Sequence, residues 1–248
     1  KGIPYAAAPF GERRFEAPGT PPSWTGIRDA TTFGATSPKS RYRDIVRSLL
    51  VEPDLPGDEC LNLNVWTPDP GAEGLPVLVW FHGGAFVNGS SAGPTYDGGA
   101  FARDGIVCVT ANYRLGADGY ARLPGRPANR GLLGQLAALR WVQDNIAAFG
   151  GDPARVTVGG ESAGAMSTGA LLAADASKGL FRRAVLQSGA GHHVIRQETA
   201  QKVVEAFAEE LRVAPTAEAL AAVPLYELLH AQVQMRARVT REARTGYW

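Results

Sequence analysis

The sequence predicts a single α/β domain in which a mostly parallel β-sheet is flanked by helices. Three observations support this fold class. Short apolar runs rich in β-branched residues alternate with segments whose apolar residues recur every three or four positions. A Gly-x-Ser-x-Gly pattern joins one such run to a helical segment. With 45% hydrophobic residues, the 248-residue chain can bury one substantial core, so we expect one domain over residues 1–248.

The first half of the chain moves from irregular structure into strands. Residues 1–59 are rich in Pro and Gly, which predicts loops and short edge strands. Apolar and polar residues alternate over 61–66, as in a strand with one buried face. The apolar runs 76–81 and 106–110 are typical of strands that are covered on both faces.

The second half alternates helices and strands. Apolar residues step by three and four from Leu132 to Phe149, which predicts an amphipathic helix that ends at Gly150-Gly151. A strand is expected over 156–159, before the serine pattern, and a helix after it. The remaining expected elements are a strand at 183–187 and helices at about 198–211, 216–222 and 225–236.

Gly160-Glu161-Ser162-Ala163-Gly164 has the spacing of a nucleophile elbow, a strained turn that exposes a serine between a strand and a helix. Bulky side chains two residues either side of Ser162 would collide with the neighbouring strand and helix, and glycine removes both clashes. The bare pattern also arises by chance in a chain with 30 glycines. The flanking strand and helix favour the elbow.

His82-Gly83-Gly84-Ala85-Phe86 follows the strand over 76–81 and is the second functional signal. In an α/β hydrolase, such a loop lies beside the elbow and contributes backbone N–H groups to an oxyanion hole. The donors here would be Gly84, Ala85 and Ala163. Alone, the loop could equally be a glycine-rich turn, but its order and its position after a strand match the elbow.

Together these motifs resemble the type B carboxylesterases, the family that includes bacterial p-nitrobenzyl esterases and the cholinesterases. The resemblance covers most of residues 1–190, the N-terminal half of such an enzyme. Its further landmarks are Gly2 to Ala6, Glu59 to Val65, Asn112 to Gly116, Asn145 to Pro153 and Leu186 to Gly189. It implies an α/β-hydrolase fold, here incomplete at both ends because the chain starts without Met and stops at Tyr247-Trp248.

The resemblance also implies roles for individual residues. Ser162 would attack an ester carbonyl, and Gly84, Ala85 and Ala163 would stabilise the oxyanion until water hydrolyses the acyl-enzyme. It further implies a structural ion-pair cluster of Arg14, Glu59 and Arg114. Phe86 and the loop 87–97 are the expected wall of the substrate pocket.

Cys60 departs from the family pattern. Relatives often pair this cysteine with an earlier one, but the upstream counterpart here is Ser37, so we expect a free thiol, which slightly favours a reducing, cytoplasmic compartment. Cys108 lies in an apolar run and reads as a buried thiol. The segment between Ser37 and Cys60 holds no Trp to receive a quaternary ammonium group.

A serine nucleophile of this kind needs a histidine base and an acid, which together form a catalytic triad. The base is not evident among the four histidines of the sequence. His82 belongs to the oxyanion loop and is expected to orient it, while His230 reads as a surface residue on a helix. His192 and His193 follow a strand end near the expected pocket and are weak candidates for the base. By resemblance, the acid and the histidine lie in a C-terminal segment beyond residue 248, so we expect these residues to be part of a longer hydrolase.

Composition excludes several other functions. The net charge is +1, which favours neither nucleic acid nor an anionic membrane as partner. No stretch approaches the ~18 apolar residues of a spanning helix. The predicted chemistry needs no cofactor and no metal ion, and the expected partner is a small-molecule ester. Two alternatives stay open: a non-catalytic binding module of the same fold, and an acyltransferase that uses the same nucleophile.

Overall fold

A six-stranded sheet forms the centre of the molecule in the computed structural model, which describes residues 1–42, 46 and 49–243, the side chains of 239–243 excepted. The strand order is β1-β2-β4-β3-β5-β6. β1 and β2 run antiparallel to their neighbours, whereas β4, β3, β5 and β6 run parallel to one another, which confirms the mostly parallel sheet. The strands are β1 (Ile3–Pro4), β2 (Asn62–Trp66), β3 (Leu75–Phe81), β4 (Val107–Ala111), β5 (Gly151–Glu161) and β6 (Arg183–Gln187).

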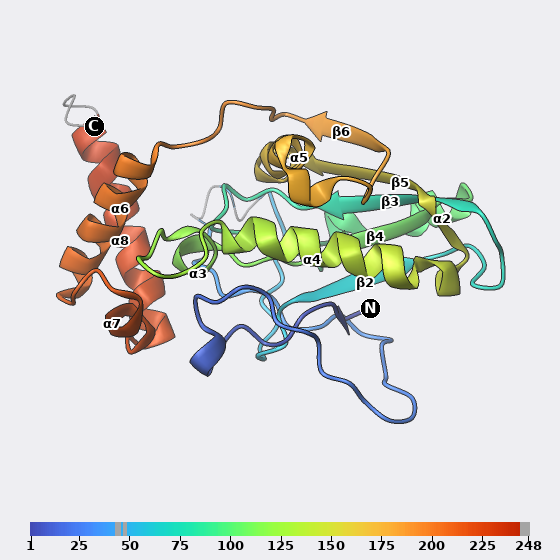
Figure 1. The fold of residues 1–248 in the computed structure, drawn as a ribbon, viewed down its shortest axis with the longest axis horizontal. Helices are drawn as coiled ribbons and strands as arrows, with labels where there is room; N and C mark the ends of the chain where they lie inside the picture. The colour runs from blue at the N-terminus through green and yellow to red at the C-terminus, as the bar shows by residue number, and fades with distance from the viewer. Residues whose placement is uncertain (43–45, 47–48, 244–248) are drawn as a thin grey trace.

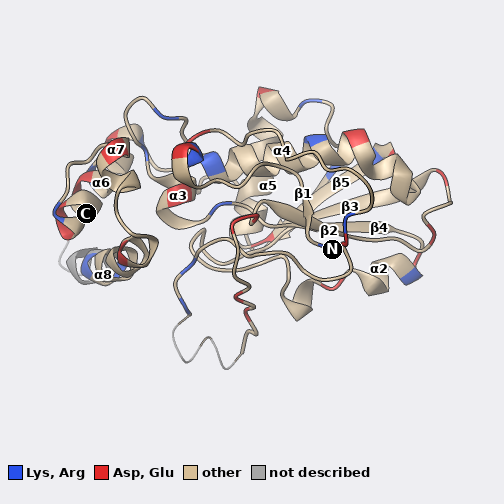
Figure 2. Ribbon diagram, turned by 90° about the horizontal axis from the view of Figure 1, so that it is seen from below, with Lys and Arg blue, Asp and Glu red and all other residues tan. Residues whose placement is uncertain are grey.

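Helices cover both faces of this sheet. Figure 2 shows α4 and α2 on opposite sides of it, and α5 packs on β3, β5 and β6. The predicted helix over 132–149 is α4 followed by a 3-10 turn, and it ends at Gly150, whose φ of 82° suits glycine. The helices are α2 (Gly99–Arg103), α3 (Gly116–Tyr120), α4 (Arg130–Asn145), α5 (Ala163–Ala173), α6 (Gln197–Leu211), α7 (Ala217–Ala221) and α8 (Leu225–Ala243).

The last three helices form a separate layer at one end of the sheet. In Figure 1 the arrowheads of β3 and β6 point toward the end where α3, α6 and α8 lie. Phe207, Leu220 and Leu228 are buried in a hydrophobic cluster of this helical layer, distinct from the cluster around the strands. The carboxyl ends of the parallel strands, where ligands bind in such sheets, therefore face the junction between the two layers.

Residues 1–59 are mostly irregular, as predicted, but their ion pairs differ from the expected cluster. Arg14 pairs with Asp118 on α3, with 3.0 Å between Nε and Oδ1. Glu59 pairs with Arg28 at 2.5 Å, and Arg114 donates to backbone carbonyls instead. The expected cluster of Arg14, Glu59 and Arg114 is therefore wrong, because the buried carboxylate comes from a helix that the sequence pattern did not predict.

Cys60 and Cys108 are both free and buried, which confirms the expectation for each. Burial raises the pKa of the Cys60 thiol to about 12, and a hydrogen bond with Ser37 acts in the opposite direction. The predicted counterpart Ser37 thus lies beside Cys60, and its hydroxyl donates to the carbonyl of Tyr113 at 2.8 Å. A hydrogen-bonded serine occupies the position where a disulfide would need a second sulfur.

Candidate active site

Ser162 sits on a strained turn between β5 and α5. Its φ of 53° and ψ of −117° lie outside the regions that L-residues prefer, which is the backbone of a nucleophile elbow. The Ser162 N–H donates to the carbonyl of Gln187 at the end of β6, 2.9 Å away, and the Ser162 carbonyl accepts from the N–H of Met166. Both neighbouring elements therefore fix the turn.

Glycines on either side of Ser162 are required by close backbone contacts. A Cβ on Gly164 would lie 2.0 Å from the carbonyl oxygen of Phe81, at the end of β3. A Cβ on Gly160 would lie 2.4 Å from the carbonyl carbon of Gly164 and 2.6 Å from the same oxygen of Phe81. The predicted clash with the neighbouring strand and helix is thus present at both positions.

The oxyanion loop, residues 82–89, curls next to this turn. A Cβ on Gly83 would lie 3.3 Å from the Cβ of Ser162, so the loop and the elbow are in direct contact. Gly84, Ala85 and Phe86 all have positive φ, at 117°, 53° and 62°. Neither Gly84 nor Ala85 donates its N–H to an acceptor among the described residues.

Ala163 supplies the third expected N–H. It is the first residue of α5, and the first N–H groups of a helix have no partner within the helix. The partial positive charge of the helix N-terminus adds to the attraction for an anion there. All three expected donors therefore lie on the loop and helix end that adjoin Ser162, and none of them donates to an acceptor among the described residues.

His82 is a buried, neutral part of the loop. Burial lowers its pKa to about 4, and its Nδ1 lies 2.7 Å from the carbonyl oxygen of Gly83. Its ring stacks on Tyr113 with 4.4 Å between centroids, and the Tyr113 hydroxyl donates to the His82 carbonyl at 2.7 Å. This packing fixes the start of the loop, in keeping with the predicted orienting role.

The other three histidines make no hydrogen bond to Ser162. His192 and His193 are exposed after β6, and neither makes a hydrogen bond to a described residue. His230 is exposed on α8, as expected, and its Nε2 lies 3.4 Å from the side-chain nitrogen of Gln234. No described histidine is hydrogen-bonded to the serine, and an acid and a base beyond residue 248 stay a prediction.

An apolar hollow of about 210 Å³ adjoins the oxyanion loop. Phe86 and Val87 form one wall, in line with the expected pocket, and α3, α6 and α8 form the others. The side chains lining those walls include Tyr120, Phe207 and Met235, with Gln232 as a polar member. A larger hollow of about 460 Å³ lies between α6 and α8, and neither the elbow nor the oxyanion loop lines it.

Two contacts to the oxyanion loop come from residues that no sequence motif marks. The Gly89 N–H donates to the Glu52 carboxylate, and the Asn88 side-chain amide donates to the carbonyl of Ser40. The sequence did not predict these contacts, because charged residues between 39 and 54 are typical of a solvent-exposed loop.

Within the described residues, no three His, Cys, Asp or Glu side chains gather closely enough to hold a metal ion. The helices of the same residues include none that is both long and apolar enough to cross a bilayer.

The chain is similar in sequence to a known protein family and to several of its members. The family model described as "Carboxylesterase family" matches residues 1–245. The para-nitrobenzyl esterase of Bacillus subtilis (strain 168) is 46% identical over 205 residues, which are 81% of this chain and 42% of that protein. The fumonisin B1 esterase of Sphingopyxis macrogoltabida is 46% identical over 197 residues, 75% of this chain and 36% of that protein.

Solved structures agree with these relatives. A structure titled as a thermophilic PNB esterase superposes with a TM-score of 0.89 at 43% identity, covering 97% of this chain and 50% of that one. The chain thus has the α/β-hydrolase fold and spans about half the length of the relatives that it matches. The matched residues include the elbow, the oxyanion loop and the strands that present them, and on this evidence the chain belongs to the carboxylesterase family.

Proposed function

We propose that this chain supplies the nucleophile and the oxyanion hole of a serine carboxylesterase that acts on small-molecule esters. The observation that carries the proposal is the contact between a strained serine and a loop with unused N–H donors: Ser162 at φ 53° adjoins Gly83. Strain at such a position is maintained only where surrounding structure enforces it, and it exposes the hydroxyl at the edge of the sheet.

The chemistry follows from acyl transfer to serine. The Ser162 hydroxyl loses its proton to a base as Oγ bonds to the ester carbonyl carbon, giving a tetrahedral oxyanion. The carbon–oxygen bond to the alcohol then breaks, and the alcohol leaves with that proton. Water adds to the acyl-enzyme by the same route and releases the carboxylic acid, which restores Ser162.

The oxyanion would be held by the N–H groups of Gly84, Ala85 and Ala163. A preorganised donor of this kind is worth ~3 kcal/mol in the transition state, or a hundredfold or more in rate. Because these groups make no competing hydrogen bond within the described protein, they are free to donate to the substrate oxygen. Their contribution is to kcat, since the charge is present in the transition state and not in the ground state.

The base and its acid partner are proposed to come from a C-terminal segment that completes the fold. The relatives are longer, since the matched region is 42% of the Bacillus subtilis esterase. Without the base, turnover would fall by roughly a millionfold, leaving only the oxyanion hole and binding. Activity is therefore proposed for the whole protein that carries residues 1–248.

The apolar hollow beside Phe86 favours an ester with an apolar group. Its walls are mostly hydrophobic side chains, with Gln232 as a single amide. Relatives named for para-nitrobenzyl and fumonisin B1 esters show that the family accepts chemically different small molecules. The proposal for this chain is accordingly the class, carboxylic esters, and not one compound.

Labelling with a fluorophosphonate tests the proposal. The reagent forms a stable phosphonyl adduct with an activated serine, and we expect the adduct on the peptide that contains Ser162. Ser162→Ala should abolish both labelling and ester hydrolysis, while Ser167→Ala, on the same helix, serves as a control because this serine is buried. The whole protein that carries residues 1–248 must be used, and the proposal is wrong if this protein is folded but neither reacts with the probe nor hydrolyses esters.

A further inference from the structure

The oxyanion loop is strained and cannot hold its own position. Positive φ values at Ala85 and Phe86, 53° and 62°, are conformations that L-residues rarely adopt. The loop's own hydrogen bonds run from the N–H groups of Val87 and Asn88 to the carbonyl of Gly84, at 3.0 and 2.9 Å. These bonds close the curl, but they do not fix it against the rest of the molecule, so the surrounding contacts must do so.

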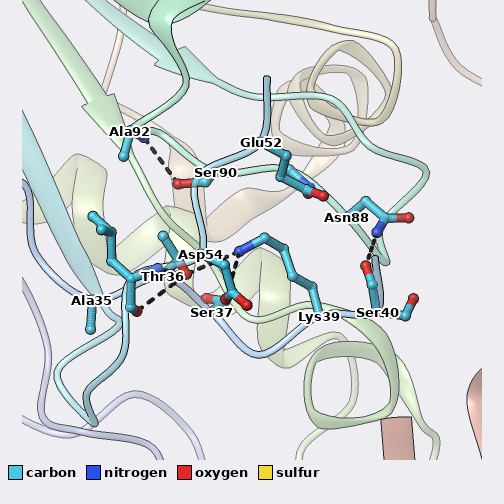
Figure 3. A network of polar contacts seen from close by, with 12 residues as sticks. Ala35, Thr36, Ser37, Lys39, Ser40, Glu52, Asp54, Asn88, Ser90 and Ala92 are labelled. Atoms are coloured by element: carbon cyan, nitrogen blue, oxygen red, sulfur yellow. Dashed lines mark hydrogen bonds and ion pairs between the residues drawn. The ribbon is translucent and has the colours of Figure 1, made fainter. Parts of the chain in front are cut away.

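Two of these surrounding contacts come from one outer segment, residues 36–40 and 49–55. At the far end of the loop, the Gly89 N–H donates to Oε1 of Glu52. One residue earlier, the Asn88 side chain donates to the carbonyl of Ser40. Figure 3 shows Glu52 and Ser40 on either side of Asn88, so both stretches of the outer segment, 36–40 and 49–55, contact the same turn of the loop.

Gly89 is packed so closely against its neighbours that a side chain would not fit at this position. Its φ is 97°, and a Cβ there would lie 2.3 Å from the Gly83 carbonyl oxygen and 2.4 Å from Nδ1 of His82. Gly89 is therefore pressed against the start of the loop, while its N–H faces Glu52. A shift of Gly89 would be transmitted directly to His82 and Gly83, and Gly83 adjoins Ser162.

The outer segment is itself anchored by a buried lysine. The Lys39 side chain is 3% exposed, and its Nζ donates to the Thr36 hydroxyl at 3.0 Å and lies 3.6 Å from Oδ1 of Asp54. Thr36 and Leu55 close the base of the segment, with backbone and side-chain hydrogen bonds of 3.0 and 3.2 Å. The Lys39 contacts to Thr36 and Asp54 are visible in Figure 3.

Lys39 and Glu52 each favour the charged form of the other. Burial lowers the pKa of Lys39, and the negative charges of Asp54 and Glu52 oppose that change. Burial raises the pKa of Glu52, and so does the nearby Asp54 charge, whereas the Gly89 N–H and the Lys39 charge oppose that change. Lys39 and Glu52 have thus both lost contact with water, which costs free energy unless their hydrogen-bond and ion-pair partners compensate for it.

We propose that Glu52 is a positioning residue for the oxyanion hole: its carboxylate holds the Gly89 N–H, with Lys39 anchoring the outer segment, so that Gly84 and Ala85 stay aimed at the oxyanion. The role rests on the proposed esterase function, because it acts through the same loop. Glu52 makes no hydrogen bond to Ser162; it contacts the loop at Gly89, and its effect is on the geometry of the donors.

The test compares Glu52→Ala with Glu52→Gln in the whole enzyme that carries the complete triad. Alanine removes the acceptor for the Gly89 N–H, whereas glutamine keeps a side-chain oxygen at the same place. We expect Glu52→Ala to lower kcat by about tenfold with KM within about twofold, and Glu52→Gln to recover most of the loss. Val51→Ala is the matched control, because Val51 is 72% exposed on the same segment.

A second variant covers the case in which Glu52→Ala does not fold. Lys39→Met keeps the buried stem and removes the charge, and we expect it to lower kcat without raising KM, like Glu52→Ala but less strongly. The proposal is overturned if kcat of a folded Glu52→Ala stays within about twofold of wild type, if KM alone changes, or if alanine and glutamine lower kcat equally. Fluorophosphonate labelling of the wild type reports separately on the esterase function.

Discussion

Gly164→Ala probes how tightly the elbow is packed against the oxyanion loop. A Cβ at residue 164 would lie 2.0 Å from the Phe81 oxygen and 3.0 Å from the His82 oxygen. Real Cβ atoms keep at least 3.0 Å from such atoms, so the start of α5 or the end of β3 must move by about 1 Å. Phe81 has little freedom to give, because it pairs with Ala111 on one side and Gly160 on the other.

The expected result is a large loss of turnover with a smaller loss of stability. A 1 Å displacement between reacting groups and their stabilising donors costs about a hundredfold in rate, so kcat should fall by about that factor. Overpacking costs ~1–3 kcal/mol, which the ~1 kcal/mol gain in helix propensity from Gly to Ala offsets in part. Ester hydrolysis and the rate of fluorophosphonate labelling measure the first effect, and the melting temperature measures the second.

Gly169→Ala is the matched control on the same helix. Its Cβ would lie 3.5 Å from its nearest neighbours, which is an ordinary van der Waals contact. This variant gains the same helix propensity without the clash, so it should keep wild-type turnover and melt at the same or a higher temperature. Equal activity of the Gly164 and Gly169 variants would refute the reasoning, since the predicted difference rests on the close contacts of residue 164 with Phe81 and His82.

Three further outcomes are expected. Burial lowers the pKa of His82 from 6.5 to about 4, so between these two pH values the unfolded chain binds a proton that the folded chain does not. The contribution of His82 to the free energy of unfolding is therefore complete above pH 6.5, and that free energy falls by up to ~3 kcal/mol as the pH approaches 4. Urea titrations should show this slope flattened in His82→Gln, and parallel slopes would contradict it. In the ion pair of Arg14 with Asp118, the two side chains are 9% and 12% exposed. Asp118→Ala leaves the buried Arg14 without its charged partner, so the free energy of unfolding should fall by about 3 kcal/mol. Asp175→Ala removes one side of a solvent-exposed ion pair and should leave the melting temperature unchanged. Cys60, whose pKa burial raises to about 12, should resist iodoacetamide in the native protein and react after unfolding, as peptide mass spectrometry would show; rapid native alkylation would argue against a buried thiol.

Most of the fold could be predicted from local sequence patterns. The strands β3 and β4 and the helix α4 were predictable because a continuous β-branched run, or a three-to-four apolar period, reports directly on burial. The short helices α2 and α3 were missed, since each begins at a glycine and its five residues show no apolar period. β5 begins at Gly151, five residues before the predicted start at 156, because its first part pairs across a register shift near Leu75.

The candidate site divides in the same way. The elbow could be predicted because its glycine spacing is a local steric requirement, and the contacts of Gly160 and Gly164 show that requirement. The ion pair of Arg14 with Asp118 and the hold of Glu52 on the oxyanion loop could not, since they join residues 104 and 37 positions apart. Contacts of that kind depend on how loops cross in space, and no periodicity encodes them.

The central claim is that Ser162 forms the acyl-enzyme beside an oxyanion hole of Gly84, Ala85 and Ala163. The most direct test is to quench the whole enzyme during turnover of a p-nitrophenyl ester and to map acylated peptides by mass spectrometry. The account predicts one acyl group, on the peptide that contains Ser162, and none in Ser162→Ala. Steady turnover with no adduct on that peptide, or undiminished turnover by Ser162→Ala, would contradict it.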